Sequence, residues 1–432
     1  MSVPDISGPA VRVLVVADAD SYVKYGSALA DQFPPDWSCR MVVATGDAAP
    51  SDRQYADAVV GTRFEGSVAE RVDVDQLRTL IARWSPDVVV AAARGHAARA
   101  TVAQIPNVPS RPVVVSGIAG VTLPVMPRGL QLRRSVDVFV VHSRREQQES
   151  RRLAPRLGVD VRFELGTLPY LAPPPSPAGC PAARRRIVFA GQALVPATRR
   201  QRAWLVDRLA ATARAHPDLD VVVKVRAVGR ETQTHAEMVG FDRLVEELGD
   251  RRPPNLLVEA GPMRDHLRSA RGLVTVSSTA FLEAIAAGVP VLALDDFGVG
   301  ASQINLVLEG SGLLGDADDL VAARFRHPDP GWLDRNYFHD PAENTWLGAV
   351  EELLATRRAT GLPPRAELRD GWLNRLRSNL DTELAFRAGS TGVAARVEAV
   401  VLRVWQAVNR FRWRLLADRI PASGDQVGSL DR

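Results

Sequence analysis

The stretch TVSSTAFLEAIAAGVPVLALDD, residues 275–296, predicts the fold and raises a question about one of its residues. It has the pattern of a buried strand, a turn, a short helix and a second buried strand, the unit from which doubly wound parallel sheets are built. Glu283 falls inside the helix, among Phe281, Leu282 and Ile285. Because burying an unpaired charge is costly, we expect its carboxylate either to point to water or to hold a polar partner.

Size and composition narrow the class of protein. The chain has 432 residues, of which 46% are hydrophobic and 24% charged, enough for two globular domains and unlike a disordered or fibrous chain. Cys39 and Cys180 stand far apart without metal-ligand spacing, which argues against a disulfide framework or a zinc site. We expect no signal peptide and no transmembrane helix, because the first apolar run is short and acidic at its end. A cytoplasmic protein fits best.

The charge is formally +4, and nearly all the basic residues are arginines, with Lys24 and Lys224 as the only lysines. Basic residues are spread along the chain and are not interleaved with stacking aromatic residues. We therefore expect no nucleic-acid partner.

Short apolar runs alternate with helical stretches in both halves of the chain, as in buried parallel strands with helical crossovers. The runs lie at residues 11–17, 40–45, 87–93, 111–116, 137–143 and 161–165, and then at 186–191, 218–225, 255–261, 273–278 and 289–296. The fold class is therefore α/β, with two Rossmann-like doubly wound domains facing a central cleft and a C-terminal helical tail. The predicted boundaries are 1–172 for the N-terminal domain, 173–186 for a proline-rich linker, 187–355 for the C-terminal domain and 356–432 for the helical extension.

The strand ends indicate where ligands bind, because such sheets bind them beyond the carboxyl ends of their strands. Ser277, Ser278 and Thr279 end one strand and precede a helix, a place suited to a phosphate. Glu283 lies one turn inside that helix, where ribose hydroxyls could satisfy it. The alternative is that the hydroxyls only cap the helix, and the segment alone leaves both interpretations open.

The segment SSTAFLEAIAAGVPVLAL resembles the nucleotide-binding segment of GT-B-fold glycosyltransferases, particularly the bacterial capsule-polysaccharide, Kdo, sialyl and glycerol-phosphate transferase branches. The resemblance implies that Ser277, Ser278 and Thr279 hold donor phosphate and that Glu283 holds ribose hydroxyls. The stretches DADSYVKYG, VVHSRRE, KVRAVGRETQTH and NYFHDP are also similar to bacterial proteins described as glycosyltransferases. The implied activity is transfer of a sugar from a nucleotide-activated donor to an envelope polysaccharide or glycolipid.

The same architecture leaves other functions open. A nucleotide-sugar epimerase and a glycerol-phosphate-type transferase also use it, and fold alone does not exclude a non-catalytic nucleotide-binding scaffold.

One departure from the capsule-type pattern concerns the strand DVVVKV. Those enzymes carry Lys-x-His-Pro there, whereas this chain has Lys224, Val225, Arg226 and Ala227. Arg226 can supply a permanent cation to a phosphate but cannot act as an acid at neutral pH. His235 is a further polar candidate nearby. Lys224 could equally extend to water, and His235 could be a solvated loop residue.

Gly191 and Gln192 follow the first strand of the second array and are also predicted donor contacts. A glycine there permits either close backbone approach to a ligand or an ordinary turn.

Sugar transfer with inversion needs a base for the acceptor hydroxyl. Asp20 is the first candidate, followed by Asp18, and His142 and His96 also follow strands. The alternative for the aspartates is capping and turn formation. The chain lacks a DxD pattern in the context that metal-dependent transferases use, so we expect no metal and no cofactor. Arg226, Lys224 and the helix N-terminus would then meet the charge of the leaving nucleotide.

The tail, residues 393–420, has an apolar side of valines with arginines elsewhere and Trp405 and Trp413 nearby. This is the composition of an interfacial helix, which would attach the protein peripherally to an anionic membrane surface at the inner face of the cell membrane. A helix that packs on the body of the protein is the equal alternative.

Overall fold

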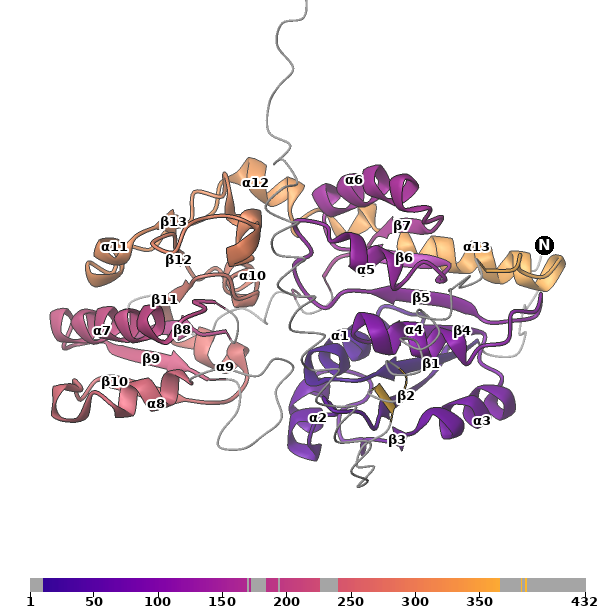
Figure 1. The fold of residues 1–432 in the computed structure, drawn as a ribbon, viewed down its shortest axis with the longest axis horizontal. Coiled ribbons are helices and arrows are strands. Elements are labelled where there is room, and N and C mark those ends of the chain that lie inside the picture. Colours follow the sequence, from indigo (N-terminus) through magenta and orange to yellow (C-terminus); the bar gives the residue numbers. More distant parts are fainter. Residues whose placement is uncertain are drawn as a thin grey trace, which may run out of the picture.

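The computed structural model describes residues 11–168, 171, 184–192, 195–225, 240–365, 382 and 385–386. Within them the chain forms two parallel sheets, each covered by helices (Figure 1). This confirms the predicted α/β class with two doubly wound domains. Most of the predicted linker and almost all of the tail beyond residue 365, including the predicted helix at 393–420, lie outside the described residues.

The first sheet has seven parallel strands in the order β3-β2-β1-β4-β5-β6-β7. The strand order reverses between β1 and β4. The strands are β1 Arg12–Ala17, β2 Ser38–Ala44, β3 Arg71–Val72, β4 Val88–Ala92, β5 Val113–Gly117, β6 Val138–Val141 and β7 Arg162–Leu165. The helices are α1 Asp20–Ala30, α2 Asp52–Val59, α3 Val74–Trp84, α4 Gly95–Ala103, α5 Pro127–Gln131 and α6 Arg144–Leu153.

The second sheet has six parallel strands in the order β10-β9-β8-β11-β12-β13, and its order reverses between β8 and β11. The strands are β8 Arg186–Ala190, β9 Asp220–Lys224, β10 Leu256–Glu259, β11 Ala270–Thr275, β12 Val291–Leu294 and β13 Leu314–Gly315. The helices are α7 Arg199–Ala215, α8 Phe241–Glu246, α9 Met263–Arg268, α10 Ala280–Ala286 and α11 Ala317–Val321.

The β-branched runs explain the strands, because both faces of each central strand are buried under helices. In β1, Val13 and Val15 belong to one core cluster and Leu14 and Val16 to another, on the opposite face of the sheet. Each of the eleven predicted apolar runs overlaps an observed strand, although β2 and β11 begin two and three residues before their runs. The two strands without a predicted run, β3 and β13, have two residues each.

The chain returns to the first domain after the second sheet. Helix α12 spans Pro330–Arg335, and helix α13 spans Trp346–Ala359 and packs against β5, β6 and β7. Trp346, Val350 and Leu354 join the core cluster that contains Val13 and Val15. Sequence reasoning placed residues through 355 in the second domain, whereas the packing of α13 puts this helix on the first.

Close packing behind the cleft requires a glycine at the end of β5. A side-chain carbon on Gly117 would lie 2.0 Å from the Tyr25 hydroxyl and 3.1 Å from the Val140 carbonyl. Gly117 therefore lets α1, which carries Tyr25, approach the strand ends that line the first domain's side of the cleft.

Candidate active site

The reversal point of the second sheet gathers polar groups from two neighbouring strand ends. Gln192, just after β8, donates a hydrogen bond from Nε2 to the Ser277 hydroxyl just after β11. The Gln192 carbonyl in turn accepts from Nη2 of buried Arg202 on α7 at 3.0 Å. In open α/β sheets, the crevice at such a reversal is where ligands bind. The structure thus brings two of the predicted donor contacts together at this point.

A backbone hydrogen bond fixes the position of Ser278. Its N–H donates to the Thr275 hydroxyl at 2.9 Å, and the Thr275 hydroxyl donates to the Ala190 carbonyl at 3.2 Å. Thr275 therefore ties the end of β11 to the end of β8. The sequence reasoning did not single out Thr275, although its position as the last residue of the strand was the available signal.

Helix capping accounts for little of this hydroxyl cluster. Thr279 occupies the N-cap position of α10 without a side-chain capping bond. The Ser278 hydroxyl accepts from the Ala280 N–H at 3.4 Å, longer than an ordinary N–H···O bond. The hydroxyls of Ser277 and Ser278 thus lie at the strand end without a strong capping bond, and both residues are buried.

Gly191 and Lys224 lie at the same edge. A side-chain carbon on Gly191 would meet the Phe241 ring at 3.0 Å, so this glycine serves the packing of α8 in the described structure. Lys224 ends β9 and is paired in register with Ala190, one strand away from the reversal point. Arg226 and His235 lie outside the described residues, and their predicted donor contacts remain predictions.

Glu283 has a partner on the other domain. Its Oε2 lies 3.1 Å from Nζ of Lys24, and 17% of the Glu283 side chain and 39% of the Lys24 side chain are exposed. Helices α1 and α10, which carry the two residues, stand on facing sides of the two domains (Figure 1). The unexpected carboxylate is therefore neither unpaired nor turned to open water, but meets Lys24 of the first domain.

The reversal point of the first sheet is built around a buried ion pair. Asp18, fully buried after β1, accepts from the Arg94 N–H at 2.9 Å and from Arg94 Nε at 2.7 Å. Nη2 of Arg94, which follows β4, also donates to Asp47 at 2.7 Å. A carboxylate that is fully buried and accepts two hydrogen bonds from an arginine is poorly placed to take a proton from an acceptor substrate. The environment of Asp18 thus argues against its predicted role as a base.

His142 is also enclosed. Only 1% of it is exposed, Nδ1 bonds the Gly166 carbonyl at 2.8 Å, and Nε2 bonds the Tyr25 hydroxyl at 3.2 Å. Burial lowers the pKa of His142 to about 4, with the Gly166 contact opposing and His339 reinforcing the shift. The ring is thus neutral and occupied within the core, which argues against the predicted role of His142 as a base.

Asp20 and His96 occupy more accessible positions. Asp20 is the first residue of α1 and is partly exposed, one helical turn before Lys24. His96, the second residue of α4, lies 2.9 Å through Nε2 from Nη2 of Arg128. Of the predicted bases, Asp20 is the carboxylate that combines a strand-end position with exposure.

A buried carboxylate of the first domain contacts the segment that follows α12. Glu146, at the start of α6 and fully buried, accepts from the Thr122 N–H at 2.8 Å and the His142 N–H at 2.9 Å. The Tyr337 hydroxyl, which follows α12, donates to the same carboxylate. Burial raises the pKa of Glu146, against the lowering effect of these donors. This carboxylate links the loop after β5 to the stretch NYFHDP, a connection that sequence reasoning missed.

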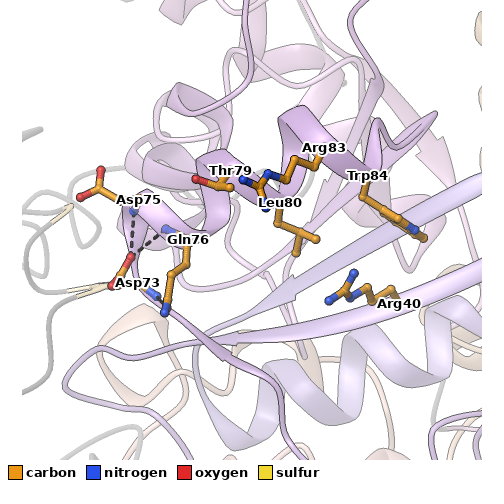
Figure 2. A pocket seen from close by; sticks show the side chains of 8 residues that line it. All are labelled: Arg40, Asp73, Asp75, Gln76, Thr79, Leu80, Arg83 and Trp84. Atoms are coloured by element: carbon orange, nitrogen blue, oxygen red, sulfur yellow. Dashed lines mark hydrogen bonds between the residues drawn. The ribbon is translucent and has the colours of Figure 1, made fainter.

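A shallow groove elsewhere is unrelated to this cleft. It lies along α3, lined by Arg40, Asp73, Asp75, Gln76, Thr79, Leu80, Arg83 and Trp84 (Figure 2). Asp73 caps α3 by accepting from the N–H groups of Asp75 and Gln76, and Arg40 pairs with Glu70 at 2.6 Å. Asp73 and Arg40 thus already serve the local structure.

Two further observations concern metals and membranes. Among the described residues, no three His, Cys, Asp or Glu side chains gather as a possible metal site. In the same part of the chain, every helix is too short or too polar to cross a bilayer.

Comparison with known proteins gives a family and a fold. The family model described as "Putative glycosyltransferase (DUF6716)" matches residues 13–353. No curated protein matches the sequence. Among solved structures, a "putative UDP-N-acetylglucosamine 2-epimerase" from Listeria monocytogenes has a TM-score of 0.50 and 11% identity, covering 83% of this chain and 100% of its own.

Two other solved structures show weaker likeness. The glycosyltransferase SnogD from Streptomyces nogalater has a TM-score of 0.46 and 16% identity, covering 81% of this chain and 100% of its own. The UDP-GlcNAc 2-epimerase from Neisseria meningitidis, bound to UDP-GlcNAc, has a TM-score of 0.47 and 9% identity, covering 80% of this chain and 99% of its own. Of these three structures, the one from Listeria monocytogenes reaches a TM-score of 0.50, and at 11% identity it speaks for the two-domain fold alone.

Proposed function

The chain belongs to the glycosyltransferase family whose model spans residues 13–353, and from that membership we propose that it transfers a sugar from a nucleotide-activated donor to a glycan or lipid-linked acceptor of the cell envelope. The observation that carries the proposal is the meeting of Gln192 and Ser277 at the reversal point of the second sheet. That crevice is where this class of sheet binds its ligand.

The donor's nucleotide would bind on the second domain. Ser277, Ser278 and Thr279 would hold phosphate through their hydroxyls and through the N–H groups at the start of α10. Glu283 would accept hydrogen bonds from the ribose hydroxyls, and Gln192 would add a contact from the end of β8. Lys224 and the predicted contacts Arg226 and His235 would supply further positive or polar groups for the phosphates.

The acceptor would bind on the first domain, with Asp20 as the base that takes its proton. A partly exposed carboxylate at the start of α1 can reach a hydroxyl in the cleft, whereas Asp18 and His142 are enclosed. We propose that the reaction requires no metal ion and no cofactor. The charge that develops on the leaving nucleotide would instead be met by Lys224, Arg226 and the start of α10.

The protein would act in the cytoplasm, at the inner face of the membrane if its acceptor is lipid-linked. The arginine and tryptophan composition of residues 393–420 supports such peripheral attachment to anionic lipid.

Thermal unfolding with a panel of nucleotides tests the donor site. UDP, dTDP, GDP, ADP and CMP are each added at 1 mM, and a bound nucleotide raises the melting temperature because it selects the folded state. At a nucleotide concentration of about 100 times Kd, the free energy of unfolding rises by roughly 2.7 kcal/mol. Glu283→Ala should reduce this gain without changing the unliganded fold, while Glu246→Ala, an exposed glutamate on α8, should not.

A radiolabelled nucleotide sugar carrying the selected base then separates an enzyme from a scaffold. Transfer or slow hydrolysis of the label supports the transferase. Binding without either reaction supports a nucleotide-binding scaffold, and conversion to an epimeric sugar nucleotide supports an epimerase. Unchanged nucleotide affinity in Glu283→Ala contradicts the ribose role.

A further inference from the structure

The ion pair between Lys24 and Glu283 places a cation of the first domain against the carboxylate that we propose for the donor's ribose. The two charged atoms lie 3.1 Å apart, and both side chains keep some exposure. Lys24 is one turn into α1, whose start follows β1, and Glu283 is one turn into α10, whose start follows β11. Each residue therefore projects from the ligand-binding edge of its own sheet.

Ribose binding changes what Glu283 needs from its neighbours. A ribose offers two hydroxyl donors, which the carboxylate can accept through its two oxygens. The Lys24 ammonium carries only hydrogen-bond donors, so it competes with the ribose hydroxyls for the same carboxylate oxygens. An ion pair with one partner 39% exposed is weak in water, so the ribose can displace it at little cost.

The displaced ammonium has a better partner nearby. Thr279, the N-cap of α10, lies four residues before Glu283, about 6 Å along the helix at 1.5 Å per residue, and Ser277 and Ser278 come directly before Thr279. A lysine side chain on its flexible four-carbon stem can cover such a distance. A nucleoside diphosphate seated at the serines carries more negative charge than a single carboxylate and attracts the ammonium more strongly.

We propose that Lys24 exchanges the Glu283 carboxylate for the diphosphate of the donor when the nucleotide binds, so that the first domain takes part in donor recognition. This inference rests on the proposed donor site. Without a nucleotide the same pair is a contact between the two domains. Lys24 thus acts as a specificity residue that senses phosphate, and Glu283 acts as the residue that senses ribose.

Binding of a nucleoside, its monophosphate and its diphosphate to Lys24 variants tests the exchange by isothermal titration calorimetry. The probes are uridine, UMP and UDP, or the same three compounds of the base selected by thermal unfolding. The variants are Lys24→Met, which removes the charge, and Lys24→Arg, which keeps it. Arg83→Met, an exposed charge at the far end of α3, controls for the overall loss of one positive charge.

Phosphate recognition predicts a selective loss. Lys24→Met should bind the diphosphate about tenfold more weakly, as expected for one charge-assisted contact, while its affinity for the nucleoside stays the same or rises. Lys24→Arg should keep most of the diphosphate affinity, and Arg83→Met should match the wild type for all three probes. The loss in Lys24→Met should shrink as salt is raised.

Three results overturn the inference. Equal affinities of Lys24→Met and wild type for all probes remove Lys24 from the donor site. Tighter binding of nucleoside and diphosphate by the same factor leaves Lys24 as a competitor for Glu283 and no more. An equal loss for nucleoside and diphosphate assigns it a role unrelated to phosphate. Failure of the wild type to bind any probe contradicts the proposed function itself, which is a separate outcome.

Discussion

Replacing Asp18 with Asn tests whether this carboxylate supports the fold or performs the chemistry. The substitution keeps the shape of the side chain and one acceptor oxygen but removes the negative charge beside Arg94. Asp18 is fully buried and accepts hydrogen bonds of 2.9 and 2.7 Å from Arg94. Breaking a buried pair by removing one charge costs roughly 3–5 kcal/mol.

The expected cost lies at or just below the lower end of that range. Arg94 keeps Asp47 at 2.7 Å, and 29% of its side chain is exposed, so its charge stays partly compensated after the change. We therefore expect Asp18→Asn to lower the free energy of unfolding by about 2–3 kcal/mol. Urea denaturation followed by tryptophan fluorescence measures this as a lower midpoint with an unchanged slope.

Asp20→Asn is the matched control, since it makes the same chemical change two residues later at a partly exposed position. It should alter the free energy of unfolding by less than about 1 kcal/mol. If Asp20 is the base, this variant should lose about 10²-fold or more in turnover. Wild-type stability together with lost turnover in Asp18→Asn would refute this reasoning and return Asp18 to the role of base.

Two further changes test the enclosed groups behind the cleft. The pKa of His142 is about 4 in the folded protein against an ordinary 6.5, so the unfolded chain binds this proton first as the pH falls. The contribution of neutral His142 to the free energy of unfolding is therefore complete above about pH 6.5 and is lost as the pH falls to about 4. The free energy of unfolding should fall by up to about 3 kcal/mol more over that window in wild type than in His142→Gln, and equal slopes contradict this. Tyr337→Phe removes a hydroxyl donor from buried Glu146 and should cost about 1–3 kcal/mol of unfolding free energy in urea, whereas an unchanged midpoint means that the contact adds no stability.

The fold could be predicted from the sequence because its strands are buried on both faces. Runs such as Val13–Ala17 and Val88–Ala92 are continuously apolar, and each is followed by a helix that covers the sheet. β3 and β13 escaped prediction since two residues carry no periodicity. The packing of α13 on the first sheet could not be predicted either, because an apolar helix face can cover either of the two sheets.

The arrangement of the proposed donor residues could be predicted because they lie close together in the sequence. Ser277, Ser278 and Glu283 are set by one strand and one helix, so local spacing fixes their relation. The need of Glu283 for a partner was also evident from its apolar neighbours. The identity of that partner was not, since Lys24 meets it only when two separately folded sheets face each other.

The base could not be chosen from strand ends alone, because the first residue after a strand often still belongs to the core. Asp18, Ala93, His142 and Gly166 each directly follow a strand of the first sheet, and each is buried. Polar residues at such positions must find partners inside, as Asp18 finds Arg94 and His142 finds the Gly166 carbonyl. Asp20 lies two residues farther on, where α1 has begun and the chain has left the core. A place at a strand end therefore does not by itself identify a base, because burial differs between such positions: Asp18 and His142 are enclosed, whereas Asp20 is partly exposed.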